Sequence, residues 1–320
     1  MHPAQFPRVR LLGLLALLLI TSAAPAAVLV GHTPSLQAQS AVRSLRPDIQ
    51  VHHILDTGTS PASVRLAKDP RTNTLFYLKQ NGDIYRVNLS RATSTRTYTT
   101  THHKVRNTQG FALGPDGTMY LVGNEDRPNS QTRATIVKGV PDANGNRVWS
   151  TLAQTADYPK SNTAYDHRFN GLVVRPSGSY LFVNSGSRTD HGEIQTAGGL
   201  YPATREVGLT ACVLRLPTSG HNLSLPNDRA ALKQAGYIFA EGTRNSFDLA
   251  FAPNGNLFAT ENGPDRDMSE ELNWLRSGRH YGFPWRIGGA DNPQQYPDYD
   301  PSTDLLLDPR YGAVKNGYYH

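Results

Sequence analysis

The chain has 320 residues, of which 38% are hydrophobic, with 28 glycines and 22 prolines. This composition disfavours a helical bundle and favours many short strands joined by turns, in a chain long enough to bury a sizeable core. The formal net charge of +6 comes from scattered basic residues rather than a basic stripe, which argues against nucleic-acid binding. The single cysteine, Cys212, excludes an intramolecular disulfide, and its apolar neighbours predict a small buried side chain.

The N-terminal 27 residues have the pattern of a secretory signal peptide. Arg8 and Arg10 precede the apolar run 11–20, and small residues dominate 22–27. A single membrane anchor is the alternative, but polar residues and Pro25 interrupt the apolar span. We therefore expect a secreted or periplasmic protein with no stable membrane span after cleavage.

A strand–turn–strand pattern recurs four times after the N-terminal region. Each copy joins two apolar strands through Asn-Gly or through Pro-(Asp/Ser/Asn)-Gly, which are turn-forming sequences. The copies span residues 76–85, 111–120, 172–181 and 249–258. Such repetition is typical of a β-propeller, because one blade cannot bury both of its faces alone. A β-sandwich is the alternative, although it does not require the same turn several times.

The predicted organisation is a signal peptide, a flexible lead-in and one all-β domain, at 1–27, 28–50 and 51–320 respectively. Two short helices are expected within the domain, at 228–235 and 270–275.

Two polar segments directly precede repeat strands. His167 precedes the third copy, where loops at the end of a propeller channel gather, so its imidazole is a candidate general base. A surface loop histidine is the alternative. Arg244 and Asn245 precede the fourth copy, where a guanidinium can bind carboxylate or quinone oxygens. The alternative for Arg244 is a structural bond to a blade carbonyl.

A glycine-proline turn and several carboxylates follow the fourth copy. Backbone carbonyls of Gly263 and Pro264 are suitable calcium ligands, and acidic residues follow within one loop. These acidic residues are Asp265, Asp267, Glu270 and Glu271. A solvated acidic loop is the alternative. The sequence contains no G-x-S-x-G elbow, H-E-x-x-H helix, Walker loop or G-x-G-x-x-G after a strand.

Five runs together resemble the glucose/sorbosone dehydrogenase family. They span 242–245, 249–255, 261–264, 270–273 and 280–284, and the resemblance covers most of the chain from about Val51. The family comprises secreted, soluble quinoproteins with a six-bladed β-propeller that bind pyrroloquinoline quinone (PQQ) and calcium. The resemblance therefore implies a six-bladed propeller in this chain.

The resemblance also implies roles for individual residues. His167 would remove the sugar hydroxyl proton, and Arg244 would stabilise negative charge on the reduced cofactor. The residues implied to contact PQQ are Arg244, Asn245 and Asn262. The residues implied to bind calcium, directly or in a neighbouring structural site, are Gly263, Pro264, Glu270, Glu271 and Tyr281.

The chain departs from the family pattern at several positions. Phe169 and Asn170 intervene between His167 and the next glycine, and Ser187 stands where the family often has aspartate. The residues Ser246 and Asp248 replace the usual proline and glycine after Arg-Asn. Asp190 and His191 lie close enough in sequence to replace the missing carboxylate. The family sequence continues beyond the segment like 311–313, so the propeller is expected to be incomplete at the C-terminus.

The resulting prediction is a quinoprotein oxidoreductase that oxidises an aldose sugar with PQQ and calcium and passes electrons to an unidentified acceptor. A non-catalytic propeller that binds sugar or protein is one alternative. A calcium-dependent lactone hydrolase is another, but it needs carboxylate or Asn ligands from several blades, which the sequence does not identify.

Overall fold

The computed structural model describes residues 44–161 and 167–307, together with the backbone of 314–315 and 318–319. The predicted signal peptide and most of the lead-in lie outside the described residues. The chain divides into units 1–53 and 54–320. In the first unit, residues 44–53 form no helix or strand. The second unit contains all the elements discussed below.

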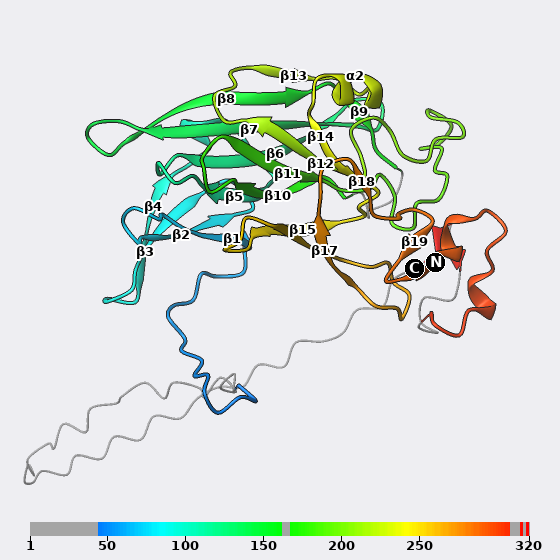
Figure 1. Ribbon diagram of the computed structural model, residues 1–320, viewed down its shortest axis with the longest axis horizontal. Helices are drawn as coiled ribbons and strands as arrows, with labels where there is room; N and C mark the ends of the chain where they lie inside the picture. The colour runs from blue at the N-terminus through cyan, green and yellow to red at the C-terminus, as the bar shows by residue number, and fades with distance from the viewer. Residues whose placement is uncertain (1–43, 162–166, 308–313, 316–317, 320) are drawn as a thin grey trace, which may run out of the picture. The chain divides into compact units, whose positions relative to one another are not determined.

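Four mainly antiparallel sheets follow one another along the second unit and are called blades 1 to 4 (Figure 1). Blade 1 contains β1 Ser63–Lys68, β2 Leu75–Lys79, β3 Ile84–Asn88 and β4 Thr93–Tyr98. Blade 2 contains β5 Thr108–Leu113, β6 Met119–Arg127, β7 Gln131–Pro141 and β8 Arg147–Thr155, with the short strands β9 Tyr158–Pro159 and β13 Leu223–Leu225. Blade 3 contains β10 Phe169–Val174, β11 Tyr180–Ser185, β12 Cys212–Pro217, β14 Ile238–Glu241 and β18 Arg279–His280. Blade 4 contains β15 Ser246–Phe251, β16 Leu257–Glu261 and β17 Glu271–Leu275.

Three hydrophobic cores lie between successive blades. One core joins Leu78 of blade 1 to Leu121 of blade 2, and the next joins Ile136 of blade 2 to Leu214 of blade 3. The third core joins blade 3 to blade 4 and includes Leu257. A sandwich would bury one core between two sheets, whereas each inner blade here is covered on both faces. The all-β, propeller-like prediction is therefore confirmed, and Cys212 is buried in the second core as expected.

The first strand of each blade lies next to the first strand of the following blade, in the order β1, β5, β10 and β15. Each of these strands has a register shift near its start. Such bulges redirect side chains at strand ends. The inner strands also approach closely, since a Cβ on Gly110 would lie 2.0 Å from the carbonyl oxygen of Asn170. The side chain of Arg65 in β1 donates to the carbonyl of Phe247 in β15 at 2.7 Å.

The four predicted turns are present, each with a glycine in the left-handed region. These glycines are Gly82, Gly117, Gly178 and Gly255. In blades 2, 3 and 4 the turn joins the first two strands, as β5–β6, β10–β11 and β15–β16. In blade 1 it joins the second and third strands, β2 and β3.

One of the two predicted helices is confirmed. Helix α2, Arg229–Gln234, begins at Asp228, whose carboxylate accepts from the backbone N–H groups of Ala230 and Ala231. The helix predicted at 270–275 is wrong, because these residues form β17. The residues of β17 pair with β16 from Glu261↔Glu271 to Leu257↔Leu275. Pairing in the sheet of blade 4 therefore outweighs the local preference of this segment for a helix.

The predicted number of blades is also wrong for the described residues, which form four blades rather than six. Long connections use much of the chain, notably the segment 186–211 between β11 and β12 and the segment after β18. The remaining elements are short: α1 Thr100–His103, η1 Pro293–Gln295, η2 Pro301–Thr303, β19 Arg286–Ile287, β20 Ala290–Asp291, β21 Val314–Lys315 and β22 Tyr318–Tyr319. No helix in the described ranges has the length and hydrophobicity needed to cross a membrane.

Candidate active site

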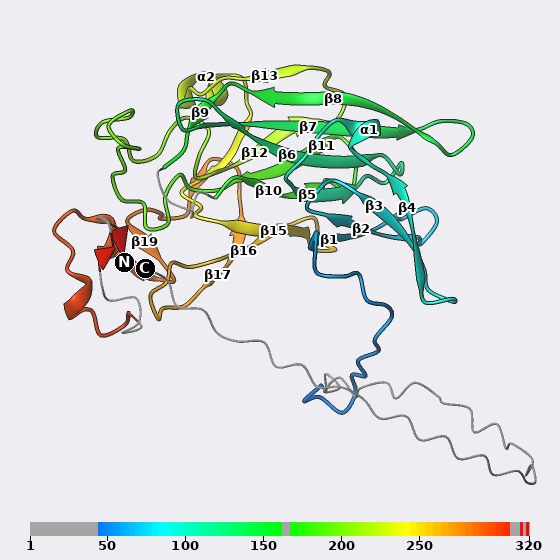
Figure 2. The same cartoon turned by 180° about the vertical axis from the view of Figure 1, so that it is seen from behind.

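Loops from blades 3 and 4 gather at one end of the second unit. Both views place the segment between β11 and β12 at the same end as the chain after β17 (Figures 1 and 2). A hydrogen bond confirms this proximity, because the Asn292 Nδ2 donates to the carbonyl of His191 at 2.8 Å. The start of β10 brings His167 to this end, and the start of β15 brings Arg244 and Asn245.

Ser187 orients the imidazole of His167. Its hydroxyl donates to the carbonyl of Thr189 at 2.6 Å, and its oxygen lies 3.0 Å from Nδ1 of His167. Because the single hydroxyl hydrogen is used on Thr189, the oxygen accepts from Nδ1–H of His167, which leaves the lone pair on Nε2. Burial, the positive charge of Arg244 and the nearby His191 hold the pKa of His167 well below its usual value. The imidazole of His167 is therefore neutral near pH 7.

Asp190 supplies the carboxylate that Ser187 lacks. Its Oδ1 lies 3.7 Å from Nε2 of His167 and also forms an ion pair with the Arg244 guanidinium. Arg244 is 4% exposed and donates further to the carbonyls of Asp190 and Asn262, each at 2.7 Å. Arg244 thus bonds to backbone carbonyls and to the carboxylate beside the candidate base, while its contact with a cofactor stays a prediction.

A buried carboxylate fixes the Arg-Asn pair. Glu261 at the end of β16 accepts from the backbone N–H of Asn245 and from the hydroxyl of Ser246 at 2.6 Å. Burial raises the pKa of Glu261 to about 7. Ser246 stands where the family usually has proline. Its hydroxyl therefore adds a hydrogen bond between β15, which directly follows Asn245, and the end of β16, which directly precedes Asn262.

An amide network connects the two blades beneath these residues. The Asn170 Nδ2 donates to Oδ1 of Asn245 at 2.8 Å, and Asn170 Oδ1 accepts from Asn184 at 2.8 Å. All three amides are buried. Asn170, one of the two residues that intervene after His167, thus lies in the bulge of β10 and positions Asn245. The sequence contained no signal for this role, because the network joins Asn170 in β10 and Asn184 in β11 to Asn245, which directly precedes β15.

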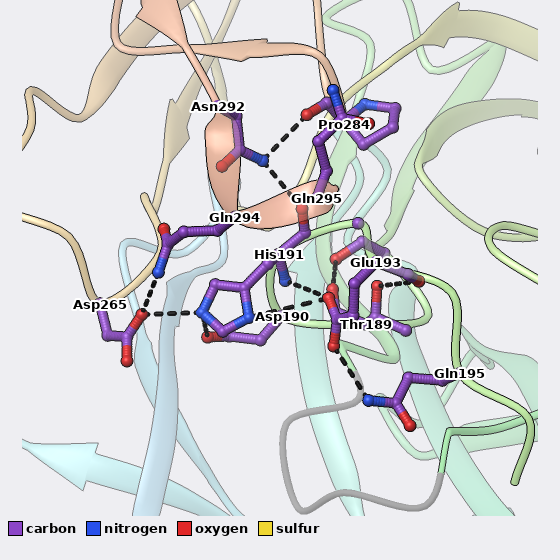
Figure 3. Close-up of polar contacts among 12 residues, drawn as sticks. Thr189, Asp190, His191, Glu193, Gln195, Asp265, Pro284, Asn292, Gln294 and Gln295 are labelled. Atoms are coloured by element: carbon purple, nitrogen blue, oxygen red, sulfur yellow. Dashed lines mark hydrogen bonds and ion pairs between the residues drawn. The ribbon is translucent and has the colours of Figure 1, made fainter. Parts of the chain in front are cut away.

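A second polar cluster lies beside Asp190 (Figure 3). Nε2 of the fully buried His191 is 2.7 Å from Oδ1 of Asp265 and 3.1 Å from Oδ2 of Asp190. Gln294 donates to the same oxygen of Asp265 at 3.0 Å. Burial acts to raise the pKa of Asp265, but hydrogen bonds and charge from His191 lower it overall. Asp265 was one of the predicted oxygen donors, while the participation of His191 and Gln294 depends on the tertiary fold.

Arg188 holds the loop that carries Asp190 and His191. Its guanidinium donates to carbonyls across segment 186–211 and to the preceding blade. The acceptors at 2.8 Å are the carbonyls of Lys160, Gln195 and Thr204. Since Arg188 is 1% exposed, this long loop is anchored from within.

The predicted calcium residues have other partners in the described structure. Glu271 accepts from the backbone N–H of Gly288 and the amide of Asn273, each at 2.9 Å. The Tyr281 hydroxyl donates to the carbonyl of Trp274 at 2.6 Å. Glu270 is exposed and accepts from the N–H of Gly263 at 3.4 Å. Among the described side chains, the only group with metal-ligand spacing is Asp190, His191 and Asp265, so the assignment of the calcium residues stays a prediction.

A family model described as Glucose / Sorbosone dehydrogenase matches residues 115–304, which include blade 2 from β6 onward, blades 3 and 4, and both clusters. The chain belongs to the glucose/sorbosone dehydrogenase family. This confirms the resemblance inferred from the runs around Arg244 and Gly263.

Similar proteins include members of the same dehydrogenase group. Quinoprotein glucose dehydrogenase B from Acinetobacter calcoaceticus is 38% identical over 225 residues, which cover 62% of this chain and 44% of that protein. The chain therefore matches less than half the length of this curated relative. The soluble aldose sugar dehydrogenase from Escherichia coli, solved in its apo-form, has a TM-score of 0.51 at 19% identity and covers 70% of this chain and 63% of its own.

A PQQ-bound aldose sugar dehydrogenase from Streptomyces coelicolor is also similar. It has a TM-score of 0.47 at 22% identity and covers 72% of this chain and 65% of its own. The likeness to the Escherichia coli structure supports the propeller-like fold of this glucose/sorbosone dehydrogenase family member.

Proposed function

We propose that this member of the glucose/sorbosone dehydrogenase family is an exported, PQQ-dependent oxidoreductase that oxidises an aldose sugar, with His167 as the general base. The observation that carries this proposal is the convergence of His167, Asp190 and Arg244 at one end of the propeller, within the region that matches the family model. The signal-like pattern of residues 1–27 supports export.

The chemistry of Arg244 fits an anionic quinone cofactor. Three of its N–H groups are used by Asp190 and Asn262, and a guanidinium has five. The two remaining donors suit carboxylate or quinone oxygens. Asn245 directly follows Arg244, and Asn262 accepts from Arg244 through its carbonyl, so both lie near this position. When bound, PQQ would supply the two-electron acceptor for sugar oxidation.

His167 would take the proton of the sugar hydroxyl at Nε2. Its Nδ1–H is held by Ser187, so the lone pair on Nε2 is available. As the imidazole becomes positively charged, the Asp190 carboxylate at 3.7 Å stabilises it. Asp190 is in turn held in position by its ion pair with Arg244.

Calcium is part of the same proposal. Calcium prefers six to eight oxygen ligands, and the described side chains do not gather such a set around Gly263 and Pro264. A calcium ion at this turn would therefore depend on the backbone carbonyls of these two residues, as the family resemblance implies.

Reconstitution tests the proposed function. The purified chain is mixed with PQQ and calcium, and reduction of a dye is measured across a panel of aldoses and lactones. We expect PQQ-dependent reduction with at least one aldose. PQQ binding without turnover would favour a non-catalytic binding propeller, and lactone hydrolysis without PQQ would favour the hydrolase alternative.

A further inference from the structure

The cluster of Asp190, His191 and Asp265 brings one imidazole nitrogen close to two carboxylates. Nε2 of His191 faces carboxylate oxygens at 2.7 and 3.1 Å, although an imidazole nitrogen carries at most one hydrogen. The three ligand atoms all lie within 4.8 Å of one another. One nitrogen and two oxygens therefore converge on a single point from two separate loops.

The separations are close to those around a metal ion. Zinc binds histidine nitrogen and carboxylate oxygen at about 2.0 to 2.2 Å, so neighbouring ligand atoms in a tetrahedral site lie about 3.3 to 3.5 Å apart. The distances of 2.7 and 3.1 Å require outward shifts of about 0.2 to 0.8 Å to reach this spacing. Side-chain rotations of the two aspartates supply shifts of this size.

Each of the three side chains is supported by an outer partner, and Figure 3 shows the partners of His191 and Asp265. Glu193 lies 3.7 Å from Nδ1 of His191 and accepts from its backbone N–H at 2.9 Å. Gln294 donates to Asp265, and Arg244 pairs with Asp190. Metal-binding histidines and carboxylates are commonly oriented by such outer carboxylate and amide groups.

Charge and an unsatisfied atom provide independent support. Oδ2 of Asp265 is buried and has no hydrogen-bond partner. The carboxylates of Asp190, Glu193 and Asp265 surround the fully buried imidazole, while Arg244 is the only Lys or Arg that forms an ion pair with them among the described residues. A divalent cation would balance this excess negative charge and use the free oxygen of Asp265.

We propose that Asp190, His191 and Asp265 form a binding site for a divalent transition-metal ion such as Zn²⁺. The imidazole nitrogen distinguishes this site from a calcium site, because calcium prefers oxygen ligands throughout. The site is separate from the calcium residues implied by the family resemblance. It shares Asp190 with the proposed sugar-oxidation site, but metal binding can be measured without PQQ or turnover.

Calorimetric titration with Zn²⁺ alone tests the site. The full chain is first treated with a chelator and checked for folding by circular dichroism. We expect one Zn²⁺ per chain, with little competition from an excess of Ca²⁺. His191→Ala should weaken Zn²⁺ binding by about 100-fold or more, whereas His221→Ala, which removes an exposed histidine elsewhere, should leave it unchanged.

A second variant covers the case in which His191→Ala does not fold. Asp265→Asn keeps the shape of the side chain but removes its charge, and it should weaken Zn²⁺ binding by about tenfold or more. The proposal is overturned if the folded wild-type chain binds no Zn²⁺, if Ca²⁺ competes at equal concentration, or if Asp265→Asn binds Zn²⁺ as the wild type does.

Discussion

Because residue 187 is a serine, the carboxylate beside His167, the candidate base, comes from another residue. Where the family pattern has an aspartate, the serine hydroxyl orients His167 but cannot balance a positive charge. Asp190, three residues later, supplies that charge from 3.7 Å. Its proximity was expected from the sequence, whereas its simultaneous contact with Arg244 was not, because the contact depends on how the long loop folds.

The sequence alone predicted some of the site residues but not those in buried polar networks. His167, Arg244 and Asn245 were predicted because each precedes a repeat strand, a local feature that the sequence displays. Glu261 and Asn170 were not assigned roles, because their partners lie on neighbouring strands. Local patterns identify residues at strand ends, while buried polar networks depend on register and on contacts between blades.

The buried side chain of Glu206 is expected to make the free energy of unfolding depend on pH. Its Oε2 accepts from the backbone N–H of Arg188 at 2.9 Å, while Oε1 is buried without a partner. Burial raises the pKa of Glu206 from 4.5 to about 7. The folded state therefore holds a proton that the unfolded state has released between these values, so the free energy of unfolding falls as the pH rises through this window.

Urea unfolding of Glu206→Gln checks this prediction. The variant mimics the protonated side chain, so it should match the wild type at pH 4 and be more stable by about 1 to 3 kcal/mol at pH 8. Glu125→Gln, which changes an exposed carboxylate, should show a difference of less than about 0.5 kcal/mol at both pH values. A Glu206→Gln difference that does not change with pH would contradict the assigned pKa shift.

At the scale of elements, the first strands of blades 3 and 4, each with a bulge near its start, position the residues of the candidate active site. Repeated turn sequences predicted these strands and their partners, because a Pro-Asp-Gly turn is encoded locally. The bulges were not predicted, although each lies near the start of an inner strand. The bulges depend on pairing between strands, which local sequence does not encode. The segment 270–275 was wrongly predicted as a helix for the same reason, because its pairing with β16 is a tertiary feature.

Gly186, which directly follows β11, packs so closely against His167 that a larger residue is expected to destabilise the fold. An added Cβ would lie 2.3 Å from Cβ of His167 and 2.8 Å from its carbonyl oxygen. Gly186→Ala should therefore displace His167 and lower the free energy of unfolding by about 2 to 4 kcal/mol. Chemical denaturation measures this change.

Gly145→Ala is the matched control for this substitution. Its added methyl would meet no atom within 4 Å, although φ is +81°. It should cost only about 1 kcal/mol, which is the backbone penalty of a left-handed alanine. Equal destabilisation by the two substitutions would show that the contact between Gly186 and His167 is not required.

At the scale of the whole molecule, blades stacked through three cores explain the propeller-like class. The repeats predicted that class, since each repeat needs neighbours to bury its faces. The four repeats correspond to the four blades of the described residues, whereas the wrong count of six came from the family resemblance. The family match from 115 to 304 and the site share the same blades, which connects the fold to the proposed quinone chemistry.

The central claim is that His167 accepts the substrate proton at a PQQ site. Anaerobic mixing of the PQQ-loaded protein with an aldose, followed by absorbance, measures the rate of cofactor reduction in a single turnover. His167→Gln should bind PQQ as the wild type does but reduce it about 10²- to 10⁴-fold more slowly, while His221→Gln should react at the wild-type rate. An unchanged rate of PQQ reduction in His167→Gln would contradict the account.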